Sequence, residues 1–444
     1  MLEPLYTAAE MRDAEAGHDV DELMARAGRA VADEVLRLFP AARRVAGVCG
    51  GGANGGDGRI ALRLLGEAGL EAVETEDPAG AEVVVDALFG TGFSGEPRPE
   101  AAALIERINV AGAPVVAVDV PSGVDASTGE VAGPAVEADF TVTFHGPKVG
   151  LEVAPGRFRT GVVSVAEIGL APAETAHSRV TREILRLVPR RRPEDTKYTA
   201  GSVLVVGGSP GLTGAACLAA GAAFRADAGY VAVAAPAESL PVLEARLLEA
   251  VKRPLEEVFD AVGRAGSLAL GPGLGRDRGE LVRRLLGETD LPAVVDADAL
   301  WELEPVERSA PTILTPHEGE LSRLLGEEST WVAAHRLEAV HRAVERFGCV
   351  VLLKGADTLV GAPGSGVLVV SLGPPSLATA GTGDVLTGVI AAFLAKGLEP
   401  SLAAAAGAAA QQVAASLVPT RAGLVASDVV SALPKALEEH GAQV

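Results

Sequence analysis

The segment Leu377–Gly397 combines a glycine-rich start, a single carboxylate and an apolar run suited to a helix. Gly381 and Gly383 stand just before the carboxylate, Asp384. Backbone amides at a glycine-rich helix start can approach an anion, which the helix dipole also favours. A carboxylate there could take a proton from a substrate hydroxyl while a phosphate occupies the amides. The pattern indicates phosphoryl transfer without a GxxxxGK[ST] loop, although an ordinary helix cap would look similar.

A second glycine-rich segment, GGGANGGDG at residues 50–58, follows an apolar strand that we expect at residues 45–49. A strand, a glycine loop and a helix in this order present backbone amides to a phosphate. Asparagine occurs only at Asn54 and Asn109, so its use in this loop is informative. Asn54 or Asp57 could instead cap the helix that we expect to begin near Asp57.

Polar residues follow three further strands predicted in the first half. Glu82–Asp86 and Val115–Asp119 each end in an aspartate, and Asp139–Phe144 leads into HGPKVG. The carboxyl ends of parallel strands share one edge of a sheet, where open α/β sheets bind ligands. We therefore expect five side chains to converge although they are far apart in sequence: Asn54, Asp86, Asp119, Ser122 and Lys148.

The second half repeats the alternation of strands and helices from Ser202 onward. Its strand ends carry the polar residues Asp296, Asp298, His317 and Lys354. Each of them has an ordinary alternative. The aspartates and the histidine could cap helices, and the lysine could be a surface residue.

Length and composition indicate a two-domain α/β protein. A chain of 444 residues exceeds one ordinary core, and 48% hydrophobic content with 53 glycines suits parallel sheets. We divide it at a Pro-, Ala- and charge-rich linker into residues 1–172 and 178–444, with a short helix expected at residues 181–188.

The charge and the apolar segments limit the classes of partner. A formal net charge of -21 argues against a general nucleic-acid or anionic-membrane binder. Three distant cysteines without a CxxC motif suggest neither a zinc site nor a disulfide framework. The N-terminus lacks a signal-peptide core, and the alanine-rich run at 401–418 is predicted to be a buried helix. We expect a cytoplasmic protein that does not bind membranes.

The motifs of the first half resemble those of the NAD(P)H-hydrate epimerase family, which has a Rossmann-like fold. They are, in order, GGGANGGDG, DALFGTGFSGEP, DVPSGVD and TFHGPKVGL. The resemblance implies that Asn54, Asp86 and Ser122 bind a potassium ion, for which oxygen ligands are suited. Asp119 and Lys148 are our candidates for the acid and base. The substrate would be held by Asn54, Gly55, Gly56, Asp57, Gly58, Gly90, Thr91, Gly92, Phe93, Ser94, Gly95, Glu96 and Asp119. This sequence has Ala53 where an asparagine is common and His145 where a glycine is usual.

The second half, from about Lys197 to Leu417, resembles the NAD(P)H-hydrate dehydratase family, which has a ribokinase-like fold. The motifs that carry the resemblance are VVGGS, GPGLG, DADAL, TPHEGEL, LLKGADT and ATAGTGD. The resemblance implies nucleotide contacts from Lys354, Gly355, Ala356, Asp357, Thr358 and Gly383, and contacts to the hydrated substrate from Ala215, Gly273, His317 and Asp384. Trp301 and Thr196 depart from the family pattern.

Together the two resemblances imply a bifunctional repair enzyme for hydrated NADH and NADPH. One domain would interconvert the R and S hydrates with the help of K⁺. The other would dehydrate the S hydrate with ADP or ATP and Mg²⁺, using Asp384 as the base. We expect small-molecule substrates and a homo-oligomer of a size that the sequence does not decide.

Two other functions are compatible with parts of the pattern. A ribokinase-like small-molecule kinase would share the glycine-rich helix start and Asp384. The first domain could instead be a binding module that has lost catalysis. A Rossmann oxidoreductase is less well supported, because the acidic residue expected after the second strand is ambiguous between Glu74 and Glu76.

Overall fold

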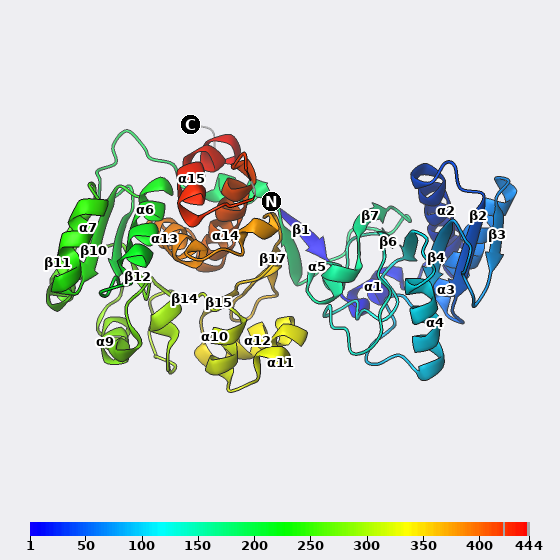
Figure 1. Ribbon diagram of the computed structural model, residues 1–444, viewed down its shortest axis with the longest axis horizontal. Helices are drawn as coiled ribbons and strands as arrows, with labels where there is room; N and C mark the ends of the chain where they lie inside the picture. The colour runs from blue at the N-terminus through cyan, green and yellow to red at the C-terminus, as the bar shows by residue number, and fades with distance from the viewer. Residues whose placement is uncertain (421, 442–444) are drawn as a thin grey trace. The chain divides into compact units, whose positions relative to one another are not determined.

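A computed structural model describes residues 1–420 and 422–441, which divide into two compact units. The N-terminal unit comprises Pro4–Ser178 together with Ala333–Arg336. The C-terminal unit contains Met1–Glu3 and most of the chain from Arg179 onward. Each unit is built on its own parallel or mostly parallel sheet with helices on its faces, which confirms the predicted α/β class (Figure 1).

The N-terminal sheet has six strands in the order β3-β2-β4-β5-β6-β7, and all of its neighbouring pairs are parallel. The strands are β2 (Arg44–Cys49), β3 (Glu71–Glu74), β4 (Val83–Ala87), β5 (Val115–Val118), β6 (Phe140–Phe144) and β7 (Val162–Ala166). Both faces of the central strands are covered by helices and carry buried apolar side chains. Val83 and Val85 share a core with helix α2 (Val20–Leu38), whereas Val84 packs with Ile105 of α4 (Pro99–Asn109).

Helix α3 (Ala53–Glu67) begins earlier than the sequence suggested, so Asn54 and Asp57 lie in its first turns. The expectation of a loop up to Asp57 was wrong because the glycines here permit close packing. A Cβ atom on Gly55 would stand 1.9 Å from the carbonyl oxygen of Gly50. The N-cap is Gly52, without a side-chain hydrogen bond, so neither Asn54 nor Asp57 caps the helix.

The C-terminal sheet follows the order β1-β8-β17-β16-β15-β14-β13-β12-β9-β10-β11. Its pairs are parallel from β11 to β15, whereas β15, β16 and β17 pair antiparallel. The strands are β1 (Leu2–Leu5), β8 (His177–Val180), β9 (Ser202–Val206), β10 (Tyr230–Ala235), β11 (Val251–Pro254), β12 (Ser267–Leu270), β13 (Ala293–Val295), β14 (Thr312–Leu314), β15 (Val350–Leu353), β16 (Thr358–Gly361) and β17 (Leu368–Val370).

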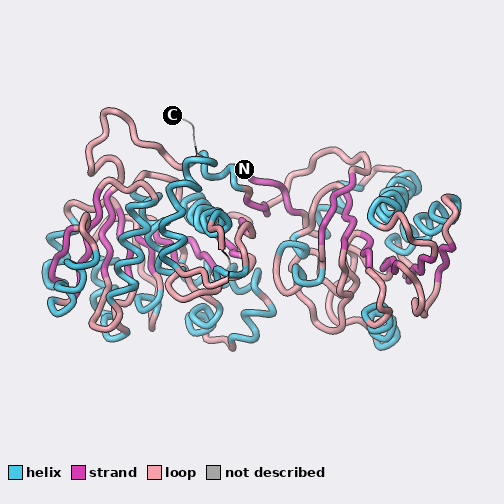
Figure 2. The backbone as a smooth tube through the Cα atoms, turned by 45° about the horizontal axis from the view of Figure 1, so that its top comes forward, coloured by secondary structure: helices cyan, strands magenta, loops and turns pink. Residues whose placement is uncertain are grey.

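Helices cover both faces of this sheet, which Figure 2 shows as a magenta layer between cyan helices. The longer helices are α6 (Thr213–Arg225), α9 (Gly279–Glu288), α10 (Glu318–Leu325), α12 (Arg336–Phe347), α13 (Thr382–Ala395), α14 (Pro400–Leu417) and α15 (Ala426–His440). Helix α13 packs against both α6 and α14, deep in the main core cluster. The predicted helix at 181–188 is a 3-10 helix, Arg182–Leu187.

The shorter helices connect these elements. They are α1 (Ala8–Glu15), α5 (Val149–Glu152), α7 (Leu240–Arg246), α8 (Val258–Val262) and α11 (Ser329–Ala334). The alanine-rich run forms α14 and is buried from Ala403 to Ala415, as expected. Within residues 1–420 and 422–441, no helix has both the length and the apolar content needed to span a bilayer.

Two candidate active sites

The first site lies at the carboxyl edge of the N-terminal sheet, where Asp86 at the end of β4 is fully buried. The hydroxyl and backbone amide of Ser122 donate to its two oxygens at 2.6 and 2.8 Å, and the amide of Leu88 donates at 3.3 Å. Burial raises the pKa of Asp86 to about 6 although these hydrogen bonds favour the charged form. The strand ends thus bring Asp86 and Ser122 together across 36 residues of sequence.

Asn54 joins this pair through the backbone of Phe89. Its side-chain amide donates to the Phe89 carbonyl at 2.8 Å, and the Ser122 hydroxyl accepts from the Phe89 amide at 2.8 Å. A Cβ atom on Gly90 would stand 2.9 Å from Asn54 Oδ1. Asn54 and Ser122 therefore contact the same backbone segment at Phe89, and Asp86 joins them through the Ser122 hydroxyl.

Asp119 and Lys148 form a buried ion pair beside this group. Their charged atoms are 2.6 Å apart, and the lysine side chain is fully buried. Lys148 also donates to the Thr143 hydroxyl and to the Phe144 carbonyl, both at 2.8 Å, while Thr143 donates to Asp119. Asp119 has φ of 66°. A buried pair with every donor of the lysine engaged is held in one geometry.

Asp57 faces the same ion pair from α3. Burial, together with the charges of Asp119 and Glu15, raises the pKa of Asp57 to about 8. Burial and the charge of Asp119 also raise the pKa of Glu15, at the end of α1. Sequence reasoning missed Glu15, which lies neither in a glycine loop nor at the end of a predicted strand. It also missed Thr143, which lies near the end of the predicted strand Asp139–Phe144 but was not assigned a role.

His145 occupies the position where the family usually has glycine, and its backbone explains that preference. Its φ is 65°, a left-handed conformation that glycine adopts without steric cost. The imidazole packs against the Tyr6 ring, with centroids 5.0 Å apart. Burial and the nearby Lys148 charge lower the pKa of His145.

The loop after β4 carries the remaining residues predicted to hold the first substrate. Phe93 stacks on Phe89, with ring centroids 4.7 Å apart. Four of the loop residues are exposed: Gly92, Ser94, Gly95 and Glu96. Gly90 and Thr91 are half-buried and lie nearer to Asn54. In α3, Gly55, Gly56 and Gly58 stand beside Asn54 and Asp57.

The second site lies at the carboxyl edge of the C-terminal sheet, around Lys354. This lysine follows β15, and its ammonium is 2.7 Å from Asp296, which follows β13, and 3.6 Å from Glu320. Burial would lower the pKa of Lys354, but the charges of Asp296 and Glu320 outweigh it and raise the pKa. The Thr387 hydroxyl donates to the other oxygen of Asp296 at 2.7 Å. Lys354 is therefore no ordinary surface lysine.

The start of α13 meets this ion pair. A Cβ atom on Gly383 would stand 3.4 Å from the Lys354 ammonium and 3.7 Å from Asp296. The N-cap is Gly381, with φ of 89° and without a side-chain hydrogen bond. The ordinary helix cap that the sequence allowed is thus not formed. The Thr382 amide donates to the Thr379 carbonyl at 3.4 Å, and the next amides of the first turn can face an anion.

Asp384 lies in the first turn of α13 and is half-buried. Burial raises its pKa to about 7, aided by the negative charge of Asp296 and opposed by Lys354. No cation lies within ion-pair distance of Asp384 among the residues that the structure describes. A carboxyl of this kind can exchange a proton near neutral pH.

His317 caps helix α10. Its Nδ1 accepts from the amides of Gly319 and Glu320 at 3.0 and 3.3 Å, and the Glu320 carboxylate accepts from the His317 amide at 2.8 Å. The alternative of a helix-capping histidine is therefore realised. Since Nδ1 accepts, a neutral ring carries its proton on Nε2, which lies 3.5 Å from Glu320 Oε1, and the side chain is 56% exposed.

The other residues predicted in this half fall into two groups beside α13. A Cβ atom on Gly273 would stand 3.2 Å from Ala215 Cβ, which places these two residues together. Gly355 and Ala356 are exposed after Lys354, while Asp357 and Thr358 are buried. Asp298 accepts from the Gly275 amide at 2.9 Å and lies 3.7 Å from Arg276. The Trp301 ring packs under Arg276, 4.2 Å from its guanidinium carbon.

The donor sets of the two sites suit different ions. Oxygen atoms from Asn54, Asp86 and Ser122 match a hard monovalent cation. Near the first amides of α13 lie the carboxylates of Asp296, Asp298 and Asp384, whose oxygens match Mg²⁺ carried by a nucleotide. No cluster of three or more His, Cys, Asp or Glu side chains shaped for a metal ion occurs in the described part of the chain.

Two protein families match separate parts of the chain. The NAD(P)H-hydrate dehydratase family matches residues 203–435. The family described as YjeF-related protein N-terminus matches residues 20–79 and 71–150.

Curated relatives match the chain over nearly its whole length. The bifunctional NAD(P)H-hydrate repair enzyme of Moorella thermoacetica is 37% identical over 98% of this chain and 96% of its own. The Escherichia coli enzyme of the same name is 35% identical over 93% of this chain and 89% of its own.

A solved structure is similar to the C-terminal unit. The ADP/ATP-dependent NAD(P)H-hydrate dehydratase of Bacillus subtilis, co-crystallised with ATP and Mg²⁺, is 28% identical, with a TM-score of 0.54. The match covers 59% of this chain and 97% of that one.

Proposed function

The chain belongs to the family of bifunctional NAD(P)H-hydrate repair enzymes, and we propose that its two activities reside in separate sites, one in each unit. The enzyme interconverts the R and S hydrates of NADH or NADPH and dehydrates the S hydrate with a nucleotide. Residues 1–172 would carry the epimerase and residues 178–444 the dehydratase. This division explains the fusion. The dehydratase accepts only the S hydrate, and the epimerase converts the R hydrate into it, so both hydrates are repaired.

The observation that carries the dehydratase assignment is the start of α13. Asp384 there has its pKa raised to about 7, and the adjacent Gly383 faces the Lys354–Asp296 pair. Asp384 would take the proton from the C6 hydroxyl of the hydrate, whose oxygen then attacks the terminal phosphate of ADP or ATP. The bond from that phosphorus to the bridging oxygen breaks, and AMP or ADP leaves. The amides of Gly381–Gly383 and Lys354 would neutralise the developing charge. Mg²⁺ bound to the nucleotide would supply further charge neutralisation.

Phosphate then leaves C6 with the ring-nitrogen lone pair assisting. The resulting cation loses a proton from C5, which restores the reduced nicotinamide. Lys354–Thr358 and Gly383 would hold the nucleotide, while Ala215, Gly273 and His317 would hold the hydrate. The Nε2 proton of His317 is suited to donate to a substrate oxygen.

In the epimerase site, Asp119 and Lys148 would act as the acid and base at C6 of the hydrate. Their 2.6 Å contact supports this assignment, since the pair can pass a proton between them without reorganising. Asn54, Asp86 and Ser122 would hold K⁺, and the α3 amides with the Gly90–Glu96 loop would hold the hydrated dinucleotide. The buried oxygens of Asp86 and Ser122 support the ion assignment.

The kinase alternative for the C-terminal unit predicts a different product. Purified protein is incubated with hydrated NADH plus ADP, and separately plus ATP, while the absorbance of reduced cofactor is followed. Recovered NADH with release of inorganic phosphate supports repair, whereas a stable phosphorylated product supports a kinase.

We also propose a cytoplasmic location, where these cofactors are used, and a homo-oligomeric assembly.

A further inference from the structure

A cavity of about 620 Å³ lies in the C-terminal unit between α6, α7 and α15. Thr213 and Gly214 line it at the start of α6, and Ala380 lines it just before α13. Val242 and Val425 contribute exposed apolar walls. Its volume falls within the range of about 300–1,000 Å³ that small-molecule sites occupy.

The cavity adjoins the proposed hydrate site. A Cβ atom on Gly381 would stand 2.6 Å from Leu218 and 3.1 Å from Ala426, two residues that line the cavity. Gly214 directly precedes Ala215, which stands beside Gly273. A dinucleotide whose nicotinamide end lies at Asp384 can therefore extend past the start of α6 into this space. Lys354 lies against Gly383 instead, where the second nucleotide is expected.

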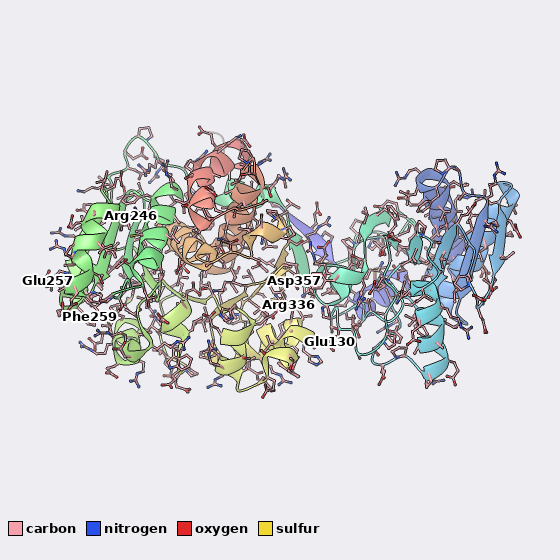
Figure 3. All side chains as sticks on the ribbon, viewed as in Figure 1. Glu130, Arg246, Glu257, Phe259, Arg336 and Asp357 are labelled. Atoms are coloured by element: carbon pink, nitrogen blue, oxygen red, sulfur yellow. The ribbon has the colours of Figure 1, made fainter. Side chains whose placement is uncertain are left out.

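Arg246, in the last turn of α7, supplies a positive charge to the cavity (Figure 3). It is exposed, and within residues 1–420 and 422–441 no carboxylate lies within ion-pair distance of its guanidinium. Glu249 also lines the cavity, but outside that distance. Burial raises the pKa of the Cys217 thiol, and the charge of Arg246 opposes that shift, which places the guanidinium near this wall.

We propose that this cavity binds the adenylate half of the hydrated dinucleotide and that Arg246 pairs with the ribose 2′-phosphate of hydrated NADPH. The inference rests on the proposed dehydratase site. Apolar walls suit adenine and ribose, and a guanidinium without an ion-pair partner suits a phosphate. In a chain with a net charge of -21, such an arginine makes the dehydratase select hydrated NADPH over hydrated NADH.

The test compares Arg246→Gln with wild type on the two S hydrates at saturating ADP. We expect KM for hydrated NADPH to rise about tenfold, as for the loss of one charge-assisted contact, with kcat and the KM for hydrated NADH unchanged. Arg246→Lys should recover part of the loss. Arg225→Gln, at the far end of α6, is the matched control and should change neither KM. Equal changes for both hydrates, or no change, would overturn the proposal.

Alkylation of Cys217 gives a second readout that does not depend on turnover. Hydrated NADPH without ADP should slow labelling of Cys217, measured by peptide mass spectrometry, and leave labelling of Cys349 unaltered. The protection should weaken in Arg246→Gln. Protection by ADP alone would place the other nucleotide here and refute the assignment. A wild-type protein that dehydrates neither hydrate would instead refute the proposed function, whatever the protection shows.

Discussion

Lys148 in the N-terminal unit and Lys354 in the C-terminal unit both lie at the carboxyl edge of a sheet, but they meet different carboxylates. Lys148 pairs with Asp119, which we propose as a reacting group. Lys354 pairs with Asp296 and Glu320, which leaves Asp384 without a cation partner in the described residues. Burial and the charge of Asp296 raise the pKa of Asp384 to about 7, and Lys354 opposes this shift only in part.

This difference relates the geometry of each site to its chemistry. Epimerisation removes a proton and returns it, so an acid and a base in contact can serve both steps. Activation of a hydroxyl for phosphoryl transfer needs a carboxyl with a pKa near neutral pH, which can accept the hydroxyl proton, next to amides that bind phosphate. In the second unit, Asp296 and Glu320 stabilise the charged form of Lys354, which can then neutralise charge on the phosphate.

The largest effect is expected when Asp384 is replaced by asparagine. Dehydration should fall by about 10²–10⁴-fold, the usual contribution of a positioned base, while epimerisation stays at the wild-type rate. Dehydration is measured with the S hydrate and ADP, and epimerisation is measured with the R hydrate in the absence of nucleotide. An equal loss of both would mean that the sites are not separate.

Replacement of Lys148 by methionine should unfold the N-terminal unit more easily and stop epimerisation. Removing one partner of a buried ion pair costs about 3–5 kcal/mol, because Asp119 is left charged and unpaired. Thermal unfolding followed by circular dichroism measures the loss. Adding Asp119→Asn to Lys148→Met should recover much of the stability but no epimerisation. A single variant as stable as wild type would contradict the buried pair.

Replacement of Asp86 by asparagine tests the ion assignment. We expect the K⁺ concentration for half-maximal epimerisation to rise by about 10–100-fold, as for loss of a ligand or its supporting group. Titration of the R hydrate reaction with KCl at constant ionic strength measures this, with dehydration as the internal control. An unchanged response to K⁺ would exclude Asp86 as a ligand.

The smallest effect is a difference in pH dependence between the two activities. Because burial and Asp296 raise the pKa of Asp384 to about 7, its carboxylate form declines below that pH. The kcat/KM of dehydration should fall about tenfold for each pH unit below 7 and level off above it. The shift also destabilises the C-terminal unit as the pH rises from about 4 to 7, since the unfolded carboxyl ionises earlier. A flat profile from pH 5 to 8 would argue against Asp384 as the base.

The sequence predicts the strands and their polar ends well because hydrophobic runs and glycine turns are local signals. It placed Asp86, Asp119 and Asp296 at strand ends, where the structure has them. It did not predict that Asp296 holds Lys354, because β13 and β15 come together through β14 and not through sequence proximity. The same reason hid Glu320, Thr387 and Thr143, whose roles depend on which strand ends are neighbours.

The start of α3 shows a second limit. Its glycines look like a loop, yet Gly55 and Gly58 lie inside a helix that packs closely on neighbouring backbone and side chains. Glycine is selected there for the missing side chain and not for a turn. A sequence alone does not distinguish these two uses.

The position of the nucleotide's terminal phosphate tests the central claim most directly. A crystal structure of the Asp384→Asn protein with ATP, Mg²⁺ and the S hydrate would locate it. We predict that this phosphate accepts hydrogen bonds from the amides of Gly381–Gly383, with the hydrate C6 oxygen between it and residue 384. A terminal phosphate bound away from the start of α13 would contradict the account.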